Sequence, residues 1–207
     1  MKPENTGQAR RIIGLTGGIA TGKSTAARYL ETRYQLPILD ADVFAREAVA
    51  PESPILAAIV QRYGEALLLS DGTLDRYRLA GIIFKHSAEK QWVEQQIHPF
   101  VRQRFVQQTL TYPAEQTLVY AIPLLFEAKL THLVSEVWVV SCTPNQQLAR
   151  LMARNQLSAD QAQARISAQM PLAQKVAQAT VVLDNSGSLE SLYAQIERAF
   201  HRLVPLA

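Results

Sequence analysis

The feature that most constrains this chain is a glycine-rich segment close to its start. Its eight residues, Gly17-Gly18-Ile19-Ala20-Thr21-Gly22-Lys23-Ser24, match the phosphate-binding pattern G-x-x-x-x-G-K-[ST]. The segment follows an apolar run at 12–15 and precedes a helical pattern, so strand, loop and helix come in the order that such a loop requires. A glycine-rich turn that binds nothing is the alternative, and this context makes it the weaker interpretation.

The loop predicts a nucleotide site that includes a metal ion. Backbone N–H groups of a tight turn, together with the positive end of the next helix, form a concave site for nucleotide phosphates. Lys23 adds a mobile positive charge, and the hydroxyl of Ser24 can coordinate a Mg²⁺ ion that bridges the phosphates. We therefore expect residues 17–25, with Thr25 at the end, to bind a nucleotide.

The composition is that of a globular protein. The chain has 207 residues, a net charge of +3 and a single cysteine, Cys142, which follows an apolar run and is expected to be a buried thiol rather than a nucleophile. No segment approaches 18 uninterrupted apolar residues, so we expect a cytoplasmic protein with no membrane contact. The charge suits a phosphate-rich substrate, whereas aromatic residues do not alternate with basic ones as nucleic-acid binding would favour.

Short apolar runs alternate with helical patterns. We expect strands at 12–15, 37–39, 118–122, 137–141 and 181–183. This alternation, without hairpin turns, predicts a mostly parallel sheet with helices on both faces, and ligands of such sheets bind beyond the carboxyl ends of the strands. The clearest helix follows the last strand, with Ser188 or Ser186 as its cap and one apolar face made by Leu189, Leu192, Tyr193, Ile196, Ala199, Phe200 and Leu203.

Two stretches depart from this alternation. The sequence between the second and third strands has no convincing strand but carries apolar stripes at helical spacing, so we expect a helical insertion over the ligand edge of the sheet. The stripes are Ile55, Ile59, Val60 and Tyr63, then Trp92, Val93, Ile97, Phe100 and Val101. The stretch 143–176 is rich in glutamine and basic residues, which favours a lid over a transferring phosphate, although a solvated pair of surface helices has a similar composition.

Two carboxylates, Asp40 and Asp42, come at the end of the second strand. If the strand continues through them, both point to the same side at the ligand edge, where a carboxylate can orient a substrate hydroxyl and accept its proton. Alternatively, either residue only caps a helix that starts near Val43. Arg46, one turn later, either contacts a substrate phosphate or pairs with these acids.

Several motifs together resemble the dephospho-CoA kinase family. They are Gly14-Leu15-Thr16-Gly17-Gly18-Ile19, Asp40-Ala41-Asp42 with Ala45-Arg46, His98-Pro99, Pro123-Leu124-Leu125-Phe126-Glu127 and Leu183-Asp184-Asn185-Ser186-Gly187. The resemblance extends in order from about Arg11 to Leu203. It implies transfer of the γ-phosphate of ATP to the 3′-hydroxyl of the dephospho-CoA ribose, the last step of coenzyme A biosynthesis, with Mg²⁺ required.

The resemblance also implies roles for particular residues. Asp42 is then the general base, while Lys23 and Ser24 hold ATP and magnesium. Arg154 resembles the lid arginine that closes over the phosphates, with Arg165 a weaker candidate. The implied substrate-binding residues are Asp40, Asp42, Arg46 and His98, although His98 taken alone is more simply a structural histidine. Asn185 begins a turn that resembles the segment running past the adenine, where backbone atoms can make the contacts.

The family architecture implies a division of the chain. A P-loop kinase core with a five-stranded parallel sheet is expected at 11–43 and 115–207, a helical dephospho-CoA domain at 44–114, and a lid at 145–176. The sequence does not give the oligomeric state, and a monomer is favoured. At Ala20 the family usually has glycine. We expect φ below zero at this position, or a slightly shifted loop, with no loss of nucleotide binding.

Two other functions share parts of this pattern. Another small-molecule or nucleoside monophosphate kinase would have the same loop, lid and carboxylate but a different substrate insertion. A nucleotide-dependent switch is the alternative of another class, but the Asn-Lys-x-Asp tetrapeptide that reads guanine is absent from the sequence. The acceptor substrate discriminates between these hypotheses.

Overall fold

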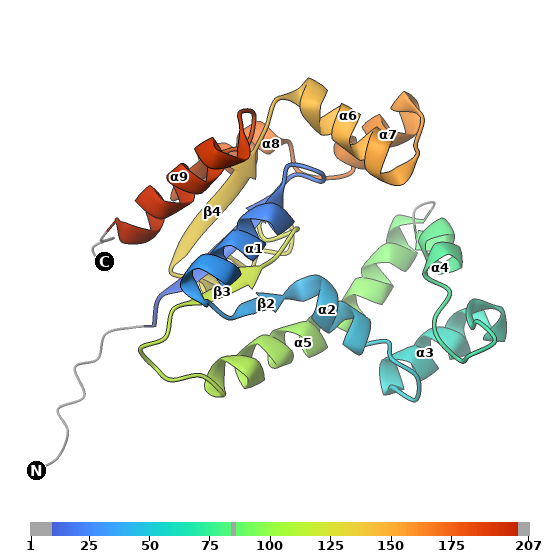
Figure 1. Cartoon of the computed structure of the whole chain (residues 1–207). Helices are drawn as coiled ribbons and strands as arrows, with labels where there is room; N and C mark the ends of the chain where they lie inside the picture. Colours follow the sequence, from blue (N-terminus) through green and yellow to red (C-terminus); the bar gives the residue numbers. More distant parts are fainter. Residues whose placement is uncertain (1–9, 84–85, 203–207) are drawn as a thin grey trace, which may run out of the picture. The chain divides into compact units, whose positions relative to one another are not determined.

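The computed structural model describes residues 10–83 and 86–202. Within it the chain forms two compact units, one made of Met1–Leu39 with Pro113–Ala207 and the other of Asp40–Tyr112. The first unit contains nearly all of the sheet with its helices, and the second is helical (Figure 1).

The sheet has five strands in the order β2-β3-β1-β4-β5. They are β1 (Ile12–Gly17), β2 (Ile38–Asp40), β3 (Leu118–Ala121), β4 (Glu136–Ser141) and β5 (Val181–Asp184). Parallel pairing joins β1 to both β3 and β4, and β4 to β5, with Ile13 opposite Val119 on one side and opposite Glu136 on the other. The predicted α/β fold with a five-stranded parallel sheet is therefore confirmed, and β1 extends two residues beyond the predicted run, to Gly17.

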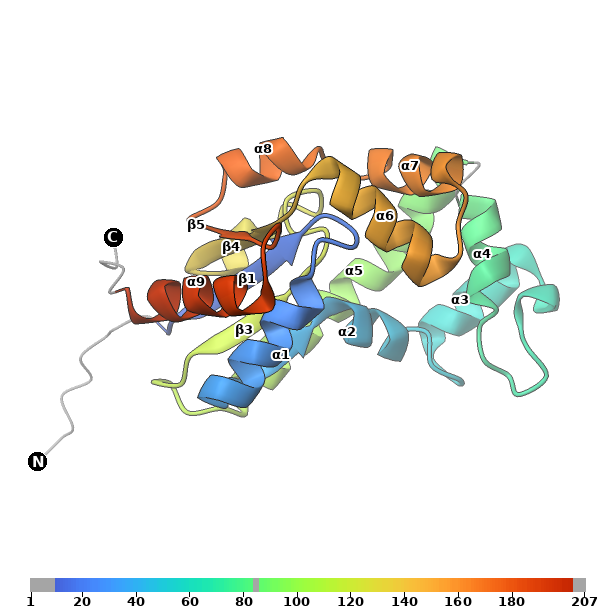
Figure 2. The same cartoon turned by 45° about the horizontal axis from the view of Figure 1, so that its top comes forward.

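Helices lie on both faces of this sheet, which explains why its central strands are mostly apolar. Helices α1 (Lys23–Tyr34) and α9 (Leu189–His201) lie on one face, and α8 (Leu172–Ala177) lies on the other (Figure 2). The core between the sheet and helices α1 and α9 is built from buried side chains. They include Ile13, Leu15, Leu30, Trp138, Val140 and Ile196. A strand with helices on both faces has no side turned to water, so polar alternation is lost.

Helix α9 forms where the apolar periodicity predicted it. Leu192, Ile196 and Ala199 are buried, and the Ser188 side chain caps the helix by accepting a hydrogen bond from the Ser191 amide. Leu189, which we expected on the same face, is 50% exposed because it lies at the first position of the helix, beyond the core. The last predicted member of the stripe, Leu203, lies outside the described residues.

The glutamine-rich stretch is helical. It forms α6 (Pro144–Asn155) and α7 (Ala159–Ser167), followed by α8. Thr143 and Ser158 start the first two helices with complete capping boxes, in which each hydroxyl accepts from a backbone amide three residues on and a glutamine side chain returns to the cap backbone.

The second unit is held together by its own apolar core. Its helices are α2 (Ala41–Glu47), α3 (Pro54–Tyr63), the 3₁₀ turn η1 (Glu65–Leu67), α4 (Arg76–Ile83) and α5 (Ser87–Leu110). Both predicted apolar stripes lie on helices, and their members Ile59 and Val93 are buried in this core. The rings of Phe44 and Phe105 meet edge to face at 5.0 Å and join α2 to α5.

No helix among the described residues is both long and apolar enough to cross a membrane.

Candidate active site

The phosphate-binding sequence forms a tight turn between β1 and α1. Strand β1 ends at Gly17 and α1 begins at Lys23, so the loop itself is short. Thr21 closes it, because both its amide and its hydroxyl donate to the carbonyl of Gly18, at 3.3 and 2.9 Å. The predicted order of strand, glycine-rich loop and helix is thereby confirmed.

At Ala20 we expected either a negative φ or a slightly shifted loop. The first alternative is wrong, because φ is +61° at this alanine, and it is +108° at Gly22. The loop must reverse within a few residues, and it does so through left-handed backbone that a side chain disfavours. The shape of the loop therefore overrides the preference of alanine.

The N-terminus of α1 suits an anion. Its N-cap is Gly22, which has no side chain to offer the first amides, and its first turn contains no acidic residue. Most helices satisfy the backbone amides of their first turn with a capping side chain. A helix without such a side chain leaves these amides exposed and presents a positive end. Nucleotide phosphates supply the negative oxygens that such an end favours. The residues present therefore fit a nucleotide, and Ser24, in the first turn, carries a hydroxyl of the kind that can coordinate Mg²⁺.

Three side chains from distant parts of the chain hold the loop from outside. The Asn185 side chain, only 6% exposed, donates from Nδ2 to the carbonyl of Thr21 at 2.7 Å. The peptide groups of Ile19 are held on two sides, because its carbonyl accepts from Gln147 Nε2 and its amide donates to Gln169 Oε1, both at 2.9 Å. The loop is thus shaped by its surroundings as well as by its own sequence.

Gln147 and Gln169 were not identified from the sequence. The stretch that contains them was recognised only by its composition, in which they are two glutamines among many. Gln147 is buried in the first turn of α6 and Gln169 precedes α8, so the loop is contacted from two separate parts of the predicted lid. Hydrogen bonds between residues more than one hundred positions apart leave no local pattern in a sequence, so no signal could have found them.

Helix α6 carries two of the predicted lid arginines. Arg150 donates from Nη2 to the backbone carbonyl of Asn185 at 3.0 Å, and Gln146 binds the next carbonyl, that of Ser186, at 2.8 Å. Arg154 lies four residues further along, on the same side of the helix and one turn beyond, where it is exposed and donates to Asn155 Oδ1. Helix α6 is therefore hydrogen-bonded to the turn at Asn185, and its last turn carries the exposed Arg154.

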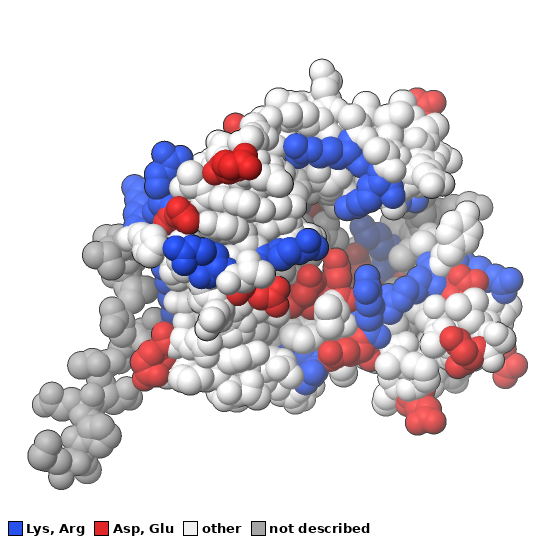
Figure 3. All heavy atoms as spheres, in the orientation of Figure 1, with Lys and Arg blue, Asp and Glu red and all other residues white. Residues whose placement is uncertain are grey.

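The surface of this region is positively charged. Lys and Arg side chains lie over α6 and α7 in Figure 3, and the basic residues of these two helices are Arg150, Arg154 and Arg165. Arg165 is exposed in the last turn of α7. A cluster of this kind is what a lid over phosphates requires.

Cys142 is buried, as predicted. It lies just after β4, 7% exposed, and burial raises the pKa of its thiol while the neighbouring Arg150 opposes that rise. A thiol with a raised pKa is a poor nucleophile at neutral pH, so the residue acts as a small apolar group of the core.

The two candidate carboxylates belong to the second unit and differ from the prediction. Strand β2 ends at Asp40 and α2 begins at Ala41, two residues earlier than expected. The expectation that Asp40 and Asp42 point to one side of a continuing strand is therefore wrong. Instead Asp40 caps α2 by accepting from the amide of Asp42 at 2.8 Å, and Asp42 is exposed in the first helical turn.

The remaining predicted substrate residues lie on helices of the same unit. Arg46 is exposed in the last turn of α2, four residues after Asp42 and so on the same side of that helix. His98 is half-buried within α5, immediately before Pro99. Among the described residues, no group of three His, Cys, Asp or Glu side chains could hold a metal ion.

Known proteins resemble this chain over most of its length. The family model for dephospho-CoA kinase matches residues 11–191. A dephospho-CoA kinase of Synechocystis sp. is 55% identical over 93% of this chain and 96% of its own length, and one of Trichormus variabilis is 54% identical over 93% and 97%.

Solved structures show the same architecture. A Thermus thermophilus protein with 32% identity superposes with a TM-score of 0.80 over 95% of this chain and 100% of its own. The shikimate kinase of Aquifex aeolicus shares the fold at 13% identity, with a TM-score of 0.53 over 91% of this chain and 95% of that one. The chain belongs to the dephospho-CoA kinase family, the enzymes that use ATP and Mg²⁺ to phosphorylate the ribose 3′-hydroxyl of dephospho-CoA and so complete coenzyme A.

Proposed function

We propose that the loop at residues 17–25 binds the phosphates of ATP in this enzyme and that Asn185 supports it from behind. The observation that carries this assignment is the shape of the loop. It is a glycine-rich turn at the N-terminus of α1, which has no capping side chain, and Asn185 fixes the Thr21 carbonyl of this turn. Backbone amides then surround the phosphates, Lys23 neutralises charge that develops during transfer, and Ser24 coordinates Mg²⁺. Mg²⁺ supplies electrostatic stabilisation of the transferring group.

Asp42 is the general base in this proposal. Asp40 already uses one carboxylate oxygen to accept the amide of Asp42, which gives it a structural role as a helix cap. Asp42 is exposed in the first turn of α2, where its carboxylate can orient a hydroxyl and accept the proton as the phosphoryl group is transferred. The Asp-Ala-Asp motif of the family supports the same choice.

The two units have separate tasks in this proposal. The helical unit Asp40–Tyr112, close to the insertion we predicted at 44–114, holds dephospho-CoA with Arg46 and His98 among its contacts. The lid at 145–176 brings Arg154 to the phosphates, where a guanidinium stabilises the charge of the transition state. We also propose that the enzyme acts as a monomer in the cytoplasm, which light scattering of the purified protein and fractionation of cells will test.

The first experiment measures ADP release from MgATP with and without dephospho-CoA, and the mass of the product. We expect release that depends on the acceptor and a product heavier by one phosphoryl group, whereas an acceptor with a 3′-deoxyribose should give none. ADP release that does not respond to dephospho-CoA would contradict the substrate assignment.

The choice of base is tested with a matched pair of variants. Asp42→Asn should lower kcat about 100-fold or more while MgADP binds normally, because the amide keeps the shape but does not accept the proton. Asp40→Asn keeps a side chain that can cap α2 and should retain most of the turnover. The reverse pattern would assign the base to Asp40.

A further inference from the structure

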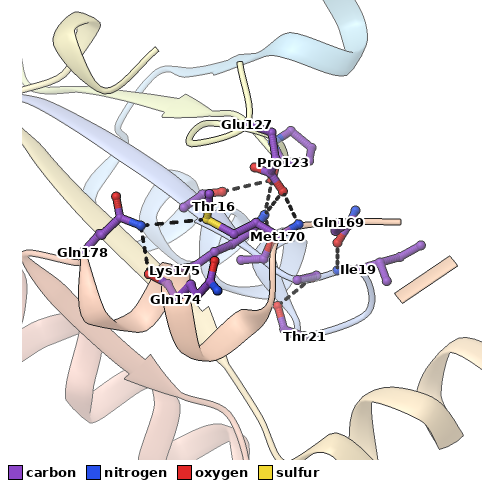
Figure 4. A network of polar contacts seen from close by, with 12 residues as sticks. Thr16, Ile19, Thr21, Pro123, Glu127, Gln169, Met170, Gln174, Lys175 and Gln178 are labelled. Atoms are coloured by element: carbon purple, nitrogen blue, oxygen red, sulfur yellow. Dashed lines mark hydrogen bonds and ion pairs between the residues drawn. The ribbon is translucent and has the colours of Figure 1, made fainter. Parts of the chain in front are cut away.

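A lysine with no exposed surface lies against the base of the phosphate loop. Lys175, in α8, is 0% exposed, and its ammonium group points into a group of acceptors (Figure 4). Its Nζ lies 2.7 Å from Glu127 Oε1, 3.2 Å from the carbonyl of Pro123 and 3.4 Å from the carbonyl of Gly17. An ammonium group has three N–H donors, so these acceptors satisfy it completely.

The acceptors belong to segments that define the loop. Gly17 is the last residue of β1, and its carbonyl fixes the peptide plane from which the phosphate loop departs. Pro123 follows β3, and its carbonyl also accepts from the hydroxyl of Thr16 at 3.1 Å. Lys175 and Thr16 therefore hold the carboxyl ends of β1 and β3 together through a shared acceptor.

The same network includes the end of the lid. Glu127 Oε1 accepts from the amide of Met170 at 3.0 Å as well as from Lys175, and Gln169 accepts from the Ile19 amide inside the phosphate loop. The segment from Gln169 to Lys175 thus contacts the loop at its start and near its middle (Figure 4). A shift of this segment would either break these hydrogen bonds or move the loop with it.

Stability alone is a poor reason for this arrangement. Taking a lysine and a glutamate out of water costs hydration free energy, and a well-packed apolar side chain is often as stabilising as a buried ion pair. In addition, the second carboxylate oxygen of Glu127 is buried with no hydrogen-bond partner among the described residues, which is a further cost. A costly polar cluster that contacts a binding loop indicates a role in binding.

We propose that Lys175 is a positioning residue for the nucleotide site: it fixes the Gly17 carbonyl, and with Glu127 it ties the end of the lid to the phosphate loop. The proposal rests on the assignment of this loop to ATP, but not on the identity of the acceptor. Because Glu127 neutralises the charge of Lys175 at 2.7 Å, the contribution of the lysine is to geometry more than to long-range attraction of phosphates.

The test uses Lys175→Met, which keeps an unbranched apolar side chain and removes the ammonium group. The matched control is Lys90→Met, at an exposed lysine of α5 that lies 3.8 Å from Glu94. We expect Lys175→Met to weaken MgADP binding at least 10-fold in calorimetry and to raise the KM for ATP similarly. The KM for dephospho-CoA should stay within about twofold of wild type, and Lys90→Met should change neither. Unchanged MgADP affinity in Lys175→Met overturns the proposal.

A second variant separates positioning from folding. Lys175→Met leaves the carboxylate of Glu127 buried without its partner and is expected to lower Tm, whereas Lys175→Met with Glu127→Gln removes both charges and should recover most of that loss. The amide oxygen that Glu127→Gln introduces can still accept from the backbone of Met170. If Lys175 positions the loop, the double variant regains Tm but not MgADP affinity. If affinity returns together with Tm, the lysine is only structural and the proposal fails.

The same measurements distinguish this proposal from the substrate assignment. MgADP binding requires no acceptor, so a loss of affinity in both variants supports the role of Lys175 even if the wild-type enzyme fails to phosphorylate dephospho-CoA. Conversely, normal phosphorylation of dephospho-CoA by wild type and by both variants, with ATP KM unchanged, rejects the positioning role and leaves the reaction intact.

Discussion

Asn185 and Thr21 are joined by a buried hydrogen bond that spans 164 positions of the sequence, with Asn185 Nδ2 donating to the Thr21 carbonyl at 2.7 Å. The bond fixes the peptide group that joins Thr21 to Gly22, the N-cap of α1. We expected this segment to act mainly through its backbone. The structure adds a side chain that shapes the phosphate loop while the Asn185 carbonyl binds Arg150 of the lid helix.

The first prediction concerns Gly22, which lies against that side chain. A Cβ at this position would overlap Asn185 Nδ2, and the φ of +108° is itself unfavourable for alanine. Gly22→Ala should therefore displace Asn185 and weaken MgADP binding by at least 10-fold, as measured by calorimetry.

The control for Gly22 is Gly72→Ala. Gly72 also has a positive φ, +77°, but nothing lies within 4 Å of a Cβ added there. That variant should lose about 1 kcal/mol of unfolding free energy from backbone strain and keep its nucleotide affinity. Equal effects of both variants on MgADP binding would show that the contact with Asn185 is unimportant.

The second prediction uses the strained alanine of the loop. Ala20→Gly relieves a φ of +61° and should raise the free energy of unfolding by up to about 1 kcal/mol in urea denaturation, since the relief exceeds the extra entropy of the unfolded chain. Ala153→Gly, at an exposed position within α6, should instead lower it by about 1 kcal/mol. A loss of stability in Ala20→Gly would mean that the alanine is not strained in the folded loop, which would contradict the prediction.

The parts of the fold that the sequence predicts are those with a local cause. The phosphate loop follows from spacing and from its flanking elements, and α9 follows from a stripe at helical spacing with Ser188 as its cap. The Asp40–Asp42 geometry was mispredicted because a strand end and a helix start compete within three residues, and the capping bond of Asp40 favours the helix. Local patterns do not decide such a boundary.

The polar contacts behind the loop could not be predicted at all. Gln147, Gln169 and Lys175 reach the loop from positions far along the chain, and each looks like an ordinary residue of a solvated helix when only its neighbours are considered. Lys175 in particular lies in the stretch 143–176, whose basic composition favoured a lid, but its side chain is fully buried. The burial of a charged side chain depends on tertiary partners, which the sequence does not display.

The third prediction compares two exposed arginines of the proposed lid. Arg154→Ala should lower kcat about 10³-fold if its guanidinium stabilises the transferring phosphoryl group, while Tm stays close to wild type because its side chain is exposed. Arg165→Ala removes the same charge from α7 and should lower kcat less than 10-fold. Steady-state kinetics with saturating ATP and dephospho-CoA measures the kcat of both variants. An equal loss of kcat in the two would assign the effect to the overall charge of the proposed lid.

The last prediction is a pH dependence that arises in the helical unit. Glu89 accepts two hydrogen bonds from Arg62, at 2.8 and 3.0 Å, and one from the hydroxyl of Tyr63 at 2.6 Å. These hydrogen bonds lower the pKa of Glu89 from its usual 4.5 to about 2, and the bonds from Arg62 have the largest effect. The carboxylate is therefore ionised in the folded unit at pH values where the unfolded chain already takes up a proton.

The sign of the effect follows from this difference. Above about pH 4.5 both states are ionised and the full contribution of Glu89 is present, and as pH falls from 4.5 toward 2 the unfolded state gains protons first and the contribution is lost. Glu89→Gln should therefore flatten the decline of unfolding free energy over this window, measured by denaturant unfolding at several pH values. Glu94→Gln, on the same helix but with a longer ion pair of 3.8 Å to Lys90, should flatten it less. A steep decline that persists in Glu89→Gln would assign the acid sensitivity to other carboxylates, because removal of the titrating group must remove its share of the linkage.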